Sequence, residues 1–454
     1  MKSKTQVLGF FCALLFVNSL NFPLLFAYMQ KLLYLCTLFM LNKFRDIWNN
    51  NTKVVENYAF MTILQILNIC FYLLIYPFLI RVLGAESYGM YAYTLAVVTL
   101  FITFVSFGFD LPAAKKIAEN AENKEMMSRV LSEVTTTKIF LEILSLIIFA
   151  VLFLVSDKMR DNALLFTIVF AQTITNIVFP QWYFQGVQRM RVVTYIQVAF
   201  KVCSLFFIFW FLHSPEDNWI YALIVTISSV AGGVVALLII MFKDGLQISF
   251  VPFSHVLNSI RDAVPFFLSN VTGVIKEQGV ILLIGQFLGM NEVAVYDLAN
   301  KIIIIPRTIF SKLNDALYPK MIAQPSQTRR RKILIGEIVI GLVSIAIIAA
   351  LGYWAVLILG GKAMIASYPV SVILSITILT WLVAGALIDF YIIPSGKTFY
   401  ITWNQLIAML TTFAFAGIGL FFTHSVYLLA VSLALSGLME IVFCSIVIHY
   451  KLKS

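Results

Sequence analysis

The chain has 454 residues, of which 61% are hydrophobic and 12% are charged, and its formal net charge is +10. A soluble domain is about half apolar and about a quarter charged, so this composition excludes an ordinary soluble fold and indicates a membrane protein. The basic residues lie mainly in short loops, which is the pattern of a membrane orientation signal rather than of a nucleic-acid surface.

The first 39 residues do not fit the pattern of the rest. Residues 7–29 are apolar, but polar residues and Pro23 interrupt them. This stretch could be a signal-like segment, an extra span, or read-through from an upstream start codon. We favour read-through, because Met40 opens a basic, amphipathic lead-in that suits the start of a first membrane helix.

Twelve apolar stretches follow, each long enough to cross a bilayer as a helix of about 20 residues. Barrel strands would alternate polar and apolar residues, and these stretches do not, so we predict an all-α polytopic membrane protein. The predicted spans are 57–80, 88–109, 136–156, 162–184, 192–212, 219–242, 263–288, 294–318, 333–358, 365–393, 400–422 and 425–449.

A weak internal repeat relates the two halves of the chain. Residues 81–96 and 286–301 each join two long apolar runs. The matched positions are Leu83-Gly84 with Leu288-Gly289, and Tyr91 with Tyr296. Transporters are often built from two related lobes with the substrate path between them. We therefore expect a six-helix N-lobe at 40–242, an interfacial linker at 243–262, and a six-helix C-lobe at 263–454.

The basic residues predict the orientation of the chain. Lys and Arg gather in the loops on one side of the predicted membrane, and the opposite side carries only Arg81, Lys158, Arg160 and Lys362. Basic loops mark the cytoplasmic side. We predict that the core N-terminus and the C-terminus are both cytoplasmic.

Charged residues inside the predicted spans are the candidates for function, since each costs roughly 2.5–3.5 kcal/mol at the bilayer centre. They are Lys201 in the fifth span, Lys276 and Glu277 in the seventh, Asp297, Lys301 and Arg307 in the eighth, and Glu440 in the twelfth. The cations outnumber the acids, which favours an interior cavity for an anionic substrate.

Two of these sites can be interpreted either as structural contacts or as part of a functional cavity. Asp297 and Lys301 are spaced i, i+4 and share a helix face, so they could be a purely structural pair. Lys201 has no acid in its own span, so its partner is another helix, a cavity or a ligand. For Lys201 we favour exposure to a water-filled, anion-attracting cavity.

The chain shows no motif of an enzyme or a metal site. It has no GxSxG, HExxH, P-loop or dinucleotide fingerprint, and its four histidines lie at span ends or in loops. The five cysteines lie in apolar stretches without a paired motif, which is typical of packing residues. We expect no catalytic residue, no metal and no resident cofactor.

Three short motifs carry a family resemblance over residues 40–454. The sequence PQWYFQG at 180–186, with IRVLGAESYG at 80–89 and PSGK at 394–397, resembles the Wzx-type polysaccharide flippases of the MOP exporter superfamily. The resemblance implies twelve helices in two lobes around a cationic central cavity. It also implies alternating-access transport of undecaprenyl-pyrophosphate-linked oligosaccharide units of O-antigen or capsule across the bacterial inner membrane.

The resemblance adds Arg81 to the candidate site. In related lipid II flippases an arginine precedes the same glycine and faces the substrate cavity; the alternative for Arg81 is a snorkelling interfacial arginine. The predicted substrate-binding cations are Arg81, Lys201, Lys276, Lys301 and Arg307, and the predicted counter-charges or ion-coupling groups are Glu277 and Asp297. Coupling to a proton or sodium gradient is expected. The partners would be the lipid-linked oligosaccharide, membrane lipid and other polysaccharide-assembly membrane proteins.

Two other functions are kept as alternatives. A cation-coupled multidrug exporter of the same superfamily would prefer an acidic cavity, whereas the interior set here is net positive. A membrane enzyme of polysaccharide assembly would need a catalytic set, and none is visible.

Overall fold

The computed structural model describes residues 52–323, 326–397 and 399–451. The chain divides into two units, Met1–Ala59 and Phe60–Ser454, and the second holds nearly all of the described residues. The predicted extension at 1–39 and the proposed start at Met40 lie outside the described residues. The described residues form helices joined by turns and contain no strand, as the all-α prediction requires.

The first two predicted spans belong to one helical segment, α3 (Thr52–Ser106), which bends at Gly84. Gly84 has a φ of 73°, a left-handed conformation that a side chain would strain and that glycine adopts without cost. The repeat motif Leu83-Gly84 therefore makes a corner between two helices.

Further helices follow α3, and short turns or changes of helix type separate them. They are α4 (Asp110–Glu119), α5 (Lys124–Val155), α6 (Asp157–Asp161), α7 (Ala163–Phe170), η1 (Ala171–Ile174), α8 (Thr175–Val178), α9 (Gln181–Gly186), α10 (Met190–Phe211), η2 (Pro215–Asp217), α11 (Asn218–Leu238), η3 (Ile239–Lys243), α12 (Phe253–Phe287), α13 (Met290–Ala323), α14 (Gln327–Gly360), η4 (Lys362–Met364), α15 (Ser367–Leu387), η5 (Ile388–Ile392), η6 (Ile393–Ser395), α16 (Phe399–Phe422) and α17 (Val426–Lys451).

Ten helical segments among the described residues are long and apolar enough to cross a membrane. One of them, Ala59–Glu119, holds both of the first two predicted spans. Helix α13 is long enough but is not among the ten, since Asp297, Lys301 and Arg307 interrupt its apolar sequence. With α13 and the bend in α3 counted, the structure agrees with the twelve predicted spans. The protein is a multi-pass membrane protein.

Two boundaries differ from the sequence prediction. The predicted linker at 243–262 is helical from Phe253 onward, where Pro252 occupies the position before the first residue of α12, and the helix continues through Pro265. The fourth predicted span is not one regular helix, since a 3-10 segment, η1, separates α7 from α8. A turn at Phe179–Pro180 then sets α9 apart from α8.

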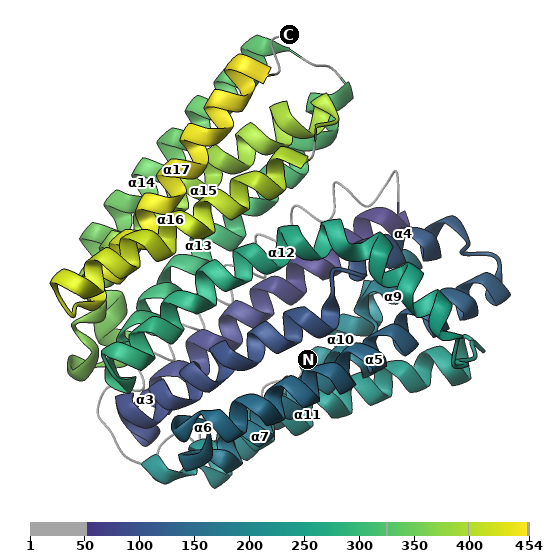
Figure 1. The fold of residues 1–454 in the computed structure, drawn as a ribbon, viewed down its shortest axis with the longest axis horizontal. Coiled ribbons are helices and arrows are strands. Elements are labelled where there is room, and N and C mark those ends of the chain that lie inside the picture. Colours follow the sequence, from purple (N-terminus) through teal and green to yellow (C-terminus); the bar gives the residue numbers. More distant parts are fainter. Residues whose placement is uncertain (1–51, 324–325, 398, 452–454) are drawn as a thin grey trace, which may run out of the picture. The chain divides into compact units, whose positions relative to one another are not determined.

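Packing joins helices from both predicted lobes. Helices α14, α15, α16 and α17 lie side by side (Figure 1), and α15 is the most buried of the candidate spans. Helix α12 contacts α16 and α17 as well as α5. One continuous apolar core includes residues from α3, α7, α11, α13 and α15, so the two predicted lobes share buried surface.

Candidate functional site

The motif PQWYFQG is a packing element. Trp182, Tyr183 and Phe184 of α9 are buried. A Cβ atom on Gly186 would lie 2.7 Å from the Ala114 carbonyl oxygen, so only glycine lets α9 approach α4 this closely.

Asp244, beyond the end of α11, ties the same motif to the rest of the predicted N-lobe. The Tyr183 hydroxyl donates to Asp244 Oδ2 at 3.0 Å, and Arg189 NH1 pairs with Asp244 Oδ1 at 2.7 Å. The most specific family motif of the sequence, PQWYFQG, therefore stabilises the packing of the predicted N-lobe.

The two repeat segments meet each other in space. A Cβ atom on Gly89 would lie 1.9 Å from the Met290 carbonyl oxygen, and one on Gly285 would lie 2.2 Å from the Tyr93 ring. Helix α3 beyond its bend therefore packs against the end of α12 and the start of α13 at backbone distance. We call this contact between α3 beyond Gly84 and the α12–α13 junction the seam. From the short helix α6, Lys158 Nζ donates to the Gly285 carbonyl oxygen at 2.8 Å and adds a polar contact to the seam.

A buried carboxylate, Asp297, lies at the centre of a polar cluster near this seam. The Tyr88 hydroxyl donates to Asp297 Oδ2 at 2.7 Å, and Lys301 Nζ lies 3.8 Å from Asp297 Oδ1. The Tyr76 ring packs edge-on against Tyr88, with ring centroids 5.1 Å apart. Asp297 and Lys301 thus lie within ion-pair distance, as their i, i+4 spacing allows, and the tyrosine adds a partner from the other predicted lobe.

Two lysines from different predicted lobes contact one turn of α3. Lys201 Nζ donates to Asn68 Oδ1 and lies 5.2 Å from the Phe71 ring centroid. Lys301 Nζ lies 4.8 Å from the Tyr72 ring centroid. A cation over an aromatic face is stabilised without neutralisation of its charge. The turn from Asn68 to Tyr72 thus contacts one ammonium group from each predicted lobe.

The other predicted cations are paired with acids. Lys276 pairs with Glu440, and their side chains are 13% and 7% exposed. Arg307 NH1 lies 2.9 Å from Glu277 Oε1, and its guanidinium carbon lies 5.2 Å from the Trp381 ring centroid.

The interior charges nearly cancel as a result of this pairing. Lys276, Lys301 and Arg307 each have a carboxylate partner, whereas Lys201 has a neutral one. Among the described residues no carboxylate lies within ion-pair distance of Lys201.

Arg81 differs from the rest of the predicted set. It is exposed on α3, in the turn before Gly84. Within the described part of the chain, no hydrogen bond or ion pair joins Arg81 to the other candidate residues. Its role in a substrate cavity stays a prediction.

The sequence reasoning missed Lys138 and Glu142 in the third span. Lys138 is buried and pairs with Asp110 at 3.1 Å, and Glu142 Oε1 accepts a hydrogen bond from the Thr173 hydroxyl at 2.5 Å. The criterion that found Lys201, a charge inside an apolar span, would also have found Glu142.

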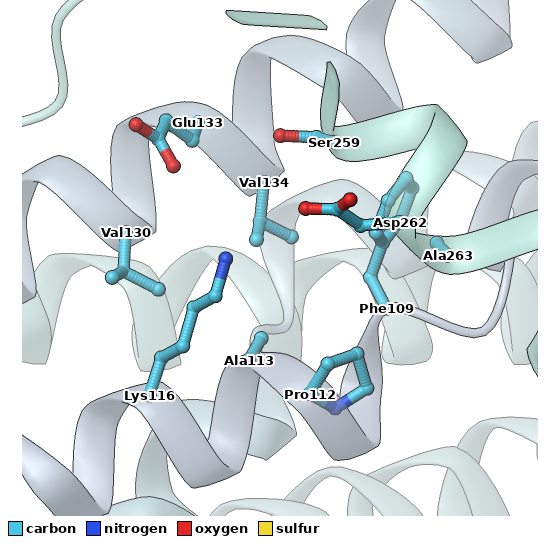
Figure 2. Close-up of a pocket in the computed structure, with 10 residues that line it drawn as sticks. All are labelled: Phe109, Pro112, Ala113, Lys116, Val130, Glu133, Val134, Ser259, Asp262 and Ala263. Atoms are coloured by element: carbon cyan, nitrogen blue, oxygen red, sulfur yellow. The ribbon is translucent and has the colours of Figure 1, made fainter. Parts of the chain in front are cut away.

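None of the predicted site residues lines either of two cavities in the described part of the protein. Figure 2 shows the first, of about 40 Å³, where Lys116 of α4, Glu133 of α5 and Asp262 of α12 surround a small space. A buried water needs about 10–15 Å³ of such a cavity, so this one has room for only a few water molecules and not for an oligosaccharide diphosphate. The second, of about 360 Å³, lies along the seam, and apart from Tyr93 and Gln286 its lining is apolar, which suits hydrocarbon.

Two curated relatives are similar to this chain over part of its length. The "Putative O-antigen transporter" of Escherichia coli (strain K12) is 24% identical over 272 residues, which are 60% of this chain and 66% of the relative. The protein of the same name from Shigella dysenteriae is 20% identical over 56% of this chain and 64% of the relative. The matched stretch thus covers just under two thirds of each relative.

Solved structures share the fold. The lipid II flippase MurJ in an inward closed conformation aligns with a TM-score of 0.68 at 14% identity, over 86% of this chain and 87% of MurJ. An inward-facing multidrug resistance MATE family transporter of the MOP superfamily aligns with a TM-score of 0.66 at 14% identity, over 84% of this chain and 94% of that one. The fold predicted from the resemblance is confirmed. Residues 54–324, more than half of the chain, match the family described as polysaccharide biosynthesis protein, and the chain belongs to that family.

Proposed function

We propose that this protein is a flippase that moves undecaprenyl-pyrophosphate-linked oligosaccharide repeat units across the bacterial inner membrane. Family membership and the two relatives named for O-antigen transport support this function. The observation that carries the proposal is Lys201, an interior cation whose hydrogen-bond partner, Asn68, is neutral. Such a charge attracts an anionic substrate group.

The chemistry of Lys201 suits a diphosphate that must bind and then leave. An ammonium group has three donors, and Asn68 accepts one of them, so two can reach phosphate oxygens. Lysine acts as a point charge rather than as a bidentate fork, which gives modest binding. Lys301 of α13, which lies over Tyr72 of the same α3 turn and 3.8 Å from Asp297, is the second cation of this proposed site. Lys276 and Arg307 remain proposed contacts whose charges are already balanced.

Transport would proceed by alternating access between the lobes at 40–242 and 263–454. The close packing of Gly89 on Met290, with the Lys158 contact beside it, would separate when one side of the path opens. The sugars and diphosphate would lie in the polar interior, while the polyprenyl chain stays in lipid or against apolar surfaces such as the seam cavity. The core termini would be cytoplasmic.

Substitutions of Lys201 test the proposal in a strain that lacks the chromosomal gene. Lys201→Ala should reduce surface glycan with normal membrane abundance, because it removes a charge-assisted contact of about 1.5–3 kcal/mol, or roughly 10- to 100-fold in binding. Lys201→Arg should retain more activity, and Lys201→Glu should be worst, since it repels the diphosphate.

Two outcomes would contradict the proposal. Reduced abundance of Lys201→Ala, with normal activity per molecule, would make Lys201 a structural residue. Intact surface glycan with increased drug sensitivity in the deletion strain would instead indicate a drug exporter. A flipping assay with purified protein in liposomes separates transport from an enzymatic role.

A further inference from the structure

Among the described residues, a carboxylate inside the predicted N-lobe has no cation partner. Glu142 occupies the run FLEILSLII of α5, where its neighbours Ile143 and Leu144 are exposed apolar residues and Leu141 is buried. An ionisable group in such a membrane segment is expensive and marks a functional site.

The contacts of Glu142 leave half of its carboxylate unsatisfied. Oε1 accepts the Thr173 hydroxyl at 2.5 Å. Oε2 is buried and has no hydrogen-bond partner in the described part of the chain. Lys138 lies one turn earlier on the same helix, but its ammonium group contacts Asp110 Oδ1 at 3.1 Å and the Asn176 carbonyl oxygen at 3.3 Å. The negative charge of Glu142 is therefore not balanced by its nearest lysine.

The helix that faces Glu142 has a break in its α-helical hydrogen-bond pattern at the same place, where a 3-10 turn replaces an α-helical one and the backbone stays helical. Thr173 lies in the 3-10 segment η1 between α7 and α8. Backbone carbonyl oxygens lie beside hydroxyl groups around the break. The Ile168 carbonyl accepts the Thr226 hydroxyl at 3.2 Å, and the Phe170 carbonyl oxygen lies 2.7 Å from Thr173 Oγ1, where it competes with Glu142 Oε1 for the single hydroxyl proton. A 3-10 stretch inside an α-helix often marks a functional hinge.

Further oxygens near this break lack partners. Ser145 Oγ, one turn after Glu142 on α5, is fully buried and has no hydrogen bond in the described residues, and the same holds for the buried Thr175 Oγ1. The surroundings of Glu142 thus contain hydroxyl and carbonyl oxygens, and Glu142 contributes the single carboxylate. Oxygen ligands suit hard cations, and one negative charge is balanced by one monovalent cation.

We propose that Glu142 takes up a monovalent cation, a proton or a sodium ion, at the break between α7 and α8, and that this uptake couples transport to an ion gradient. The coupling role rests on the proposed flippase function; the cation site itself does not. The site differs from the predicted ion-coupling groups, since Glu277 pairs with Arg307 and Asp297 contacts both Tyr88 and Lys301.

Coupling follows from the two charge states of Glu142. With a cation bound, the carboxylate is neutralised and the closed packing of α5 on the break is favoured. Without a cation, the bare charge favours an arrangement in which the break admits water. A ligand shifts such an equilibrium by its differential affinity for the two arrangements.

Transport in proteoliposomes tests the coupling. Wild-type protein should flip lipid-linked oligosaccharide faster under one of two conditions, a pH gradient in choline buffer or a sodium gradient at equal pH. The gradient that increases the rate identifies the cation. Glu142→Gln mimics the neutralised carboxylate, so it should flip at the wild-type rate without a gradient and lose the stimulation. Glu119→Gln is the control for an exposed acid that already has a partner, Lys115, and it should keep the stimulation. Full gradient stimulation of Glu142→Gln would overturn the coupling role.

A second measurement needs no substrate. The melting temperature of purified wild-type protein should rise with sodium concentration, or in choline as the pH falls, and Glu142→Gln should abolish the dependence. Thr173→Val keeps the carboxylate but removes its hydroxyl donor, so it should weaken the dependence. If the melting temperature of Glu142→Gln follows cations as in wild type, the cation site is rejected. The purified protein could flip no lipid-linked sugar and still have a melting temperature that depends on cations through Glu142. That result would support the cation site and reject the flippase function.

Discussion

Removal of one member of the Lys276–Glu440 pair should destabilise the protein strongly. The pair joins α12 to α17, and its side chains are 13% and 7% exposed, so water cannot replace a lost partner. Breaking a buried ion pair by removal of one partner costs about 3–5 kcal/mol, because the remaining charge stays buried. We expect Lys276→Met to lose this amount of unfolding free energy.

The double substitution Lys276→Met with Glu440→Leu should recover most of that loss. Both charges are then absent, and apolar side chains of similar size can replace a buried pair at little or no cost. Lys201→Met is the matched single control, since its partner Asn68 is neutral, and we expect it to lose only about 1 kcal/mol.

Equilibrium unfolding in mixed micelles measures all four proteins, and membrane abundance provides a second measurement. The difference between the double variant and the sum of the single variants gives the coupling energy of the pair. If Lys276→Met loses less than about 1 kcal/mol, or if the double variant is no more stable than Lys276→Met, the ion pair does not stabilise the fold and the reasoning is refuted.

Three other predictions concern packing, topology and the start of the chain. Gly89→Ala should lower unfolding free energy by about 1–3 kcal/mol, because its Cβ would lie 1.9 Å from a carbonyl oxygen of α13; Gly336→Ala, in open space on α14, should not. In a cysteine-free background, an impermeant thiol reagent should label Asp161→Cys but not Glu122→Cys in intact cells, and the reverse would invert the predicted orientation. A chain without residues 1–39 should complement a deletion fully; loss of function at normal abundance would give that segment a role.

Local sequence spacing predicted only part of the candidate site. The Asp297–Lys301 pair follows from i, i+4 spacing on one helix, and the structure contains it. The partners of Lys276 and Lys201 are on helices distant in the sequence, so no local pattern indicates them.

The fold was predicted in the same way, from local properties. Apolar length located the spans, because a membrane helix must cover the bilayer thickness. It did not show that Gly84 joins the first two spans without a loop, nor that α12 begins at Phe253. The corner is a backbone property of one glycine in an apolar sequence, and the early helix start is a property of a polar stretch that hydropathy assigns to a loop.

The distance along the chain between Lys276 and Glu440 has a consequence for how the protein is made. The two residues are 164 positions apart, and synthesis proceeds at about 5–20 residues per second. Lys276 therefore leaves the ribosome roughly 8–33 s before its counter-ion exists. During that interval α12 must hold an unpaired ammonium group in the insertion machinery, at the membrane surface or against a temporary partner. Assembly of the C-terminal helices thus waits for the last helix to be translated, and a nascent chain that stalls before α17 should be an early substrate for membrane proteases.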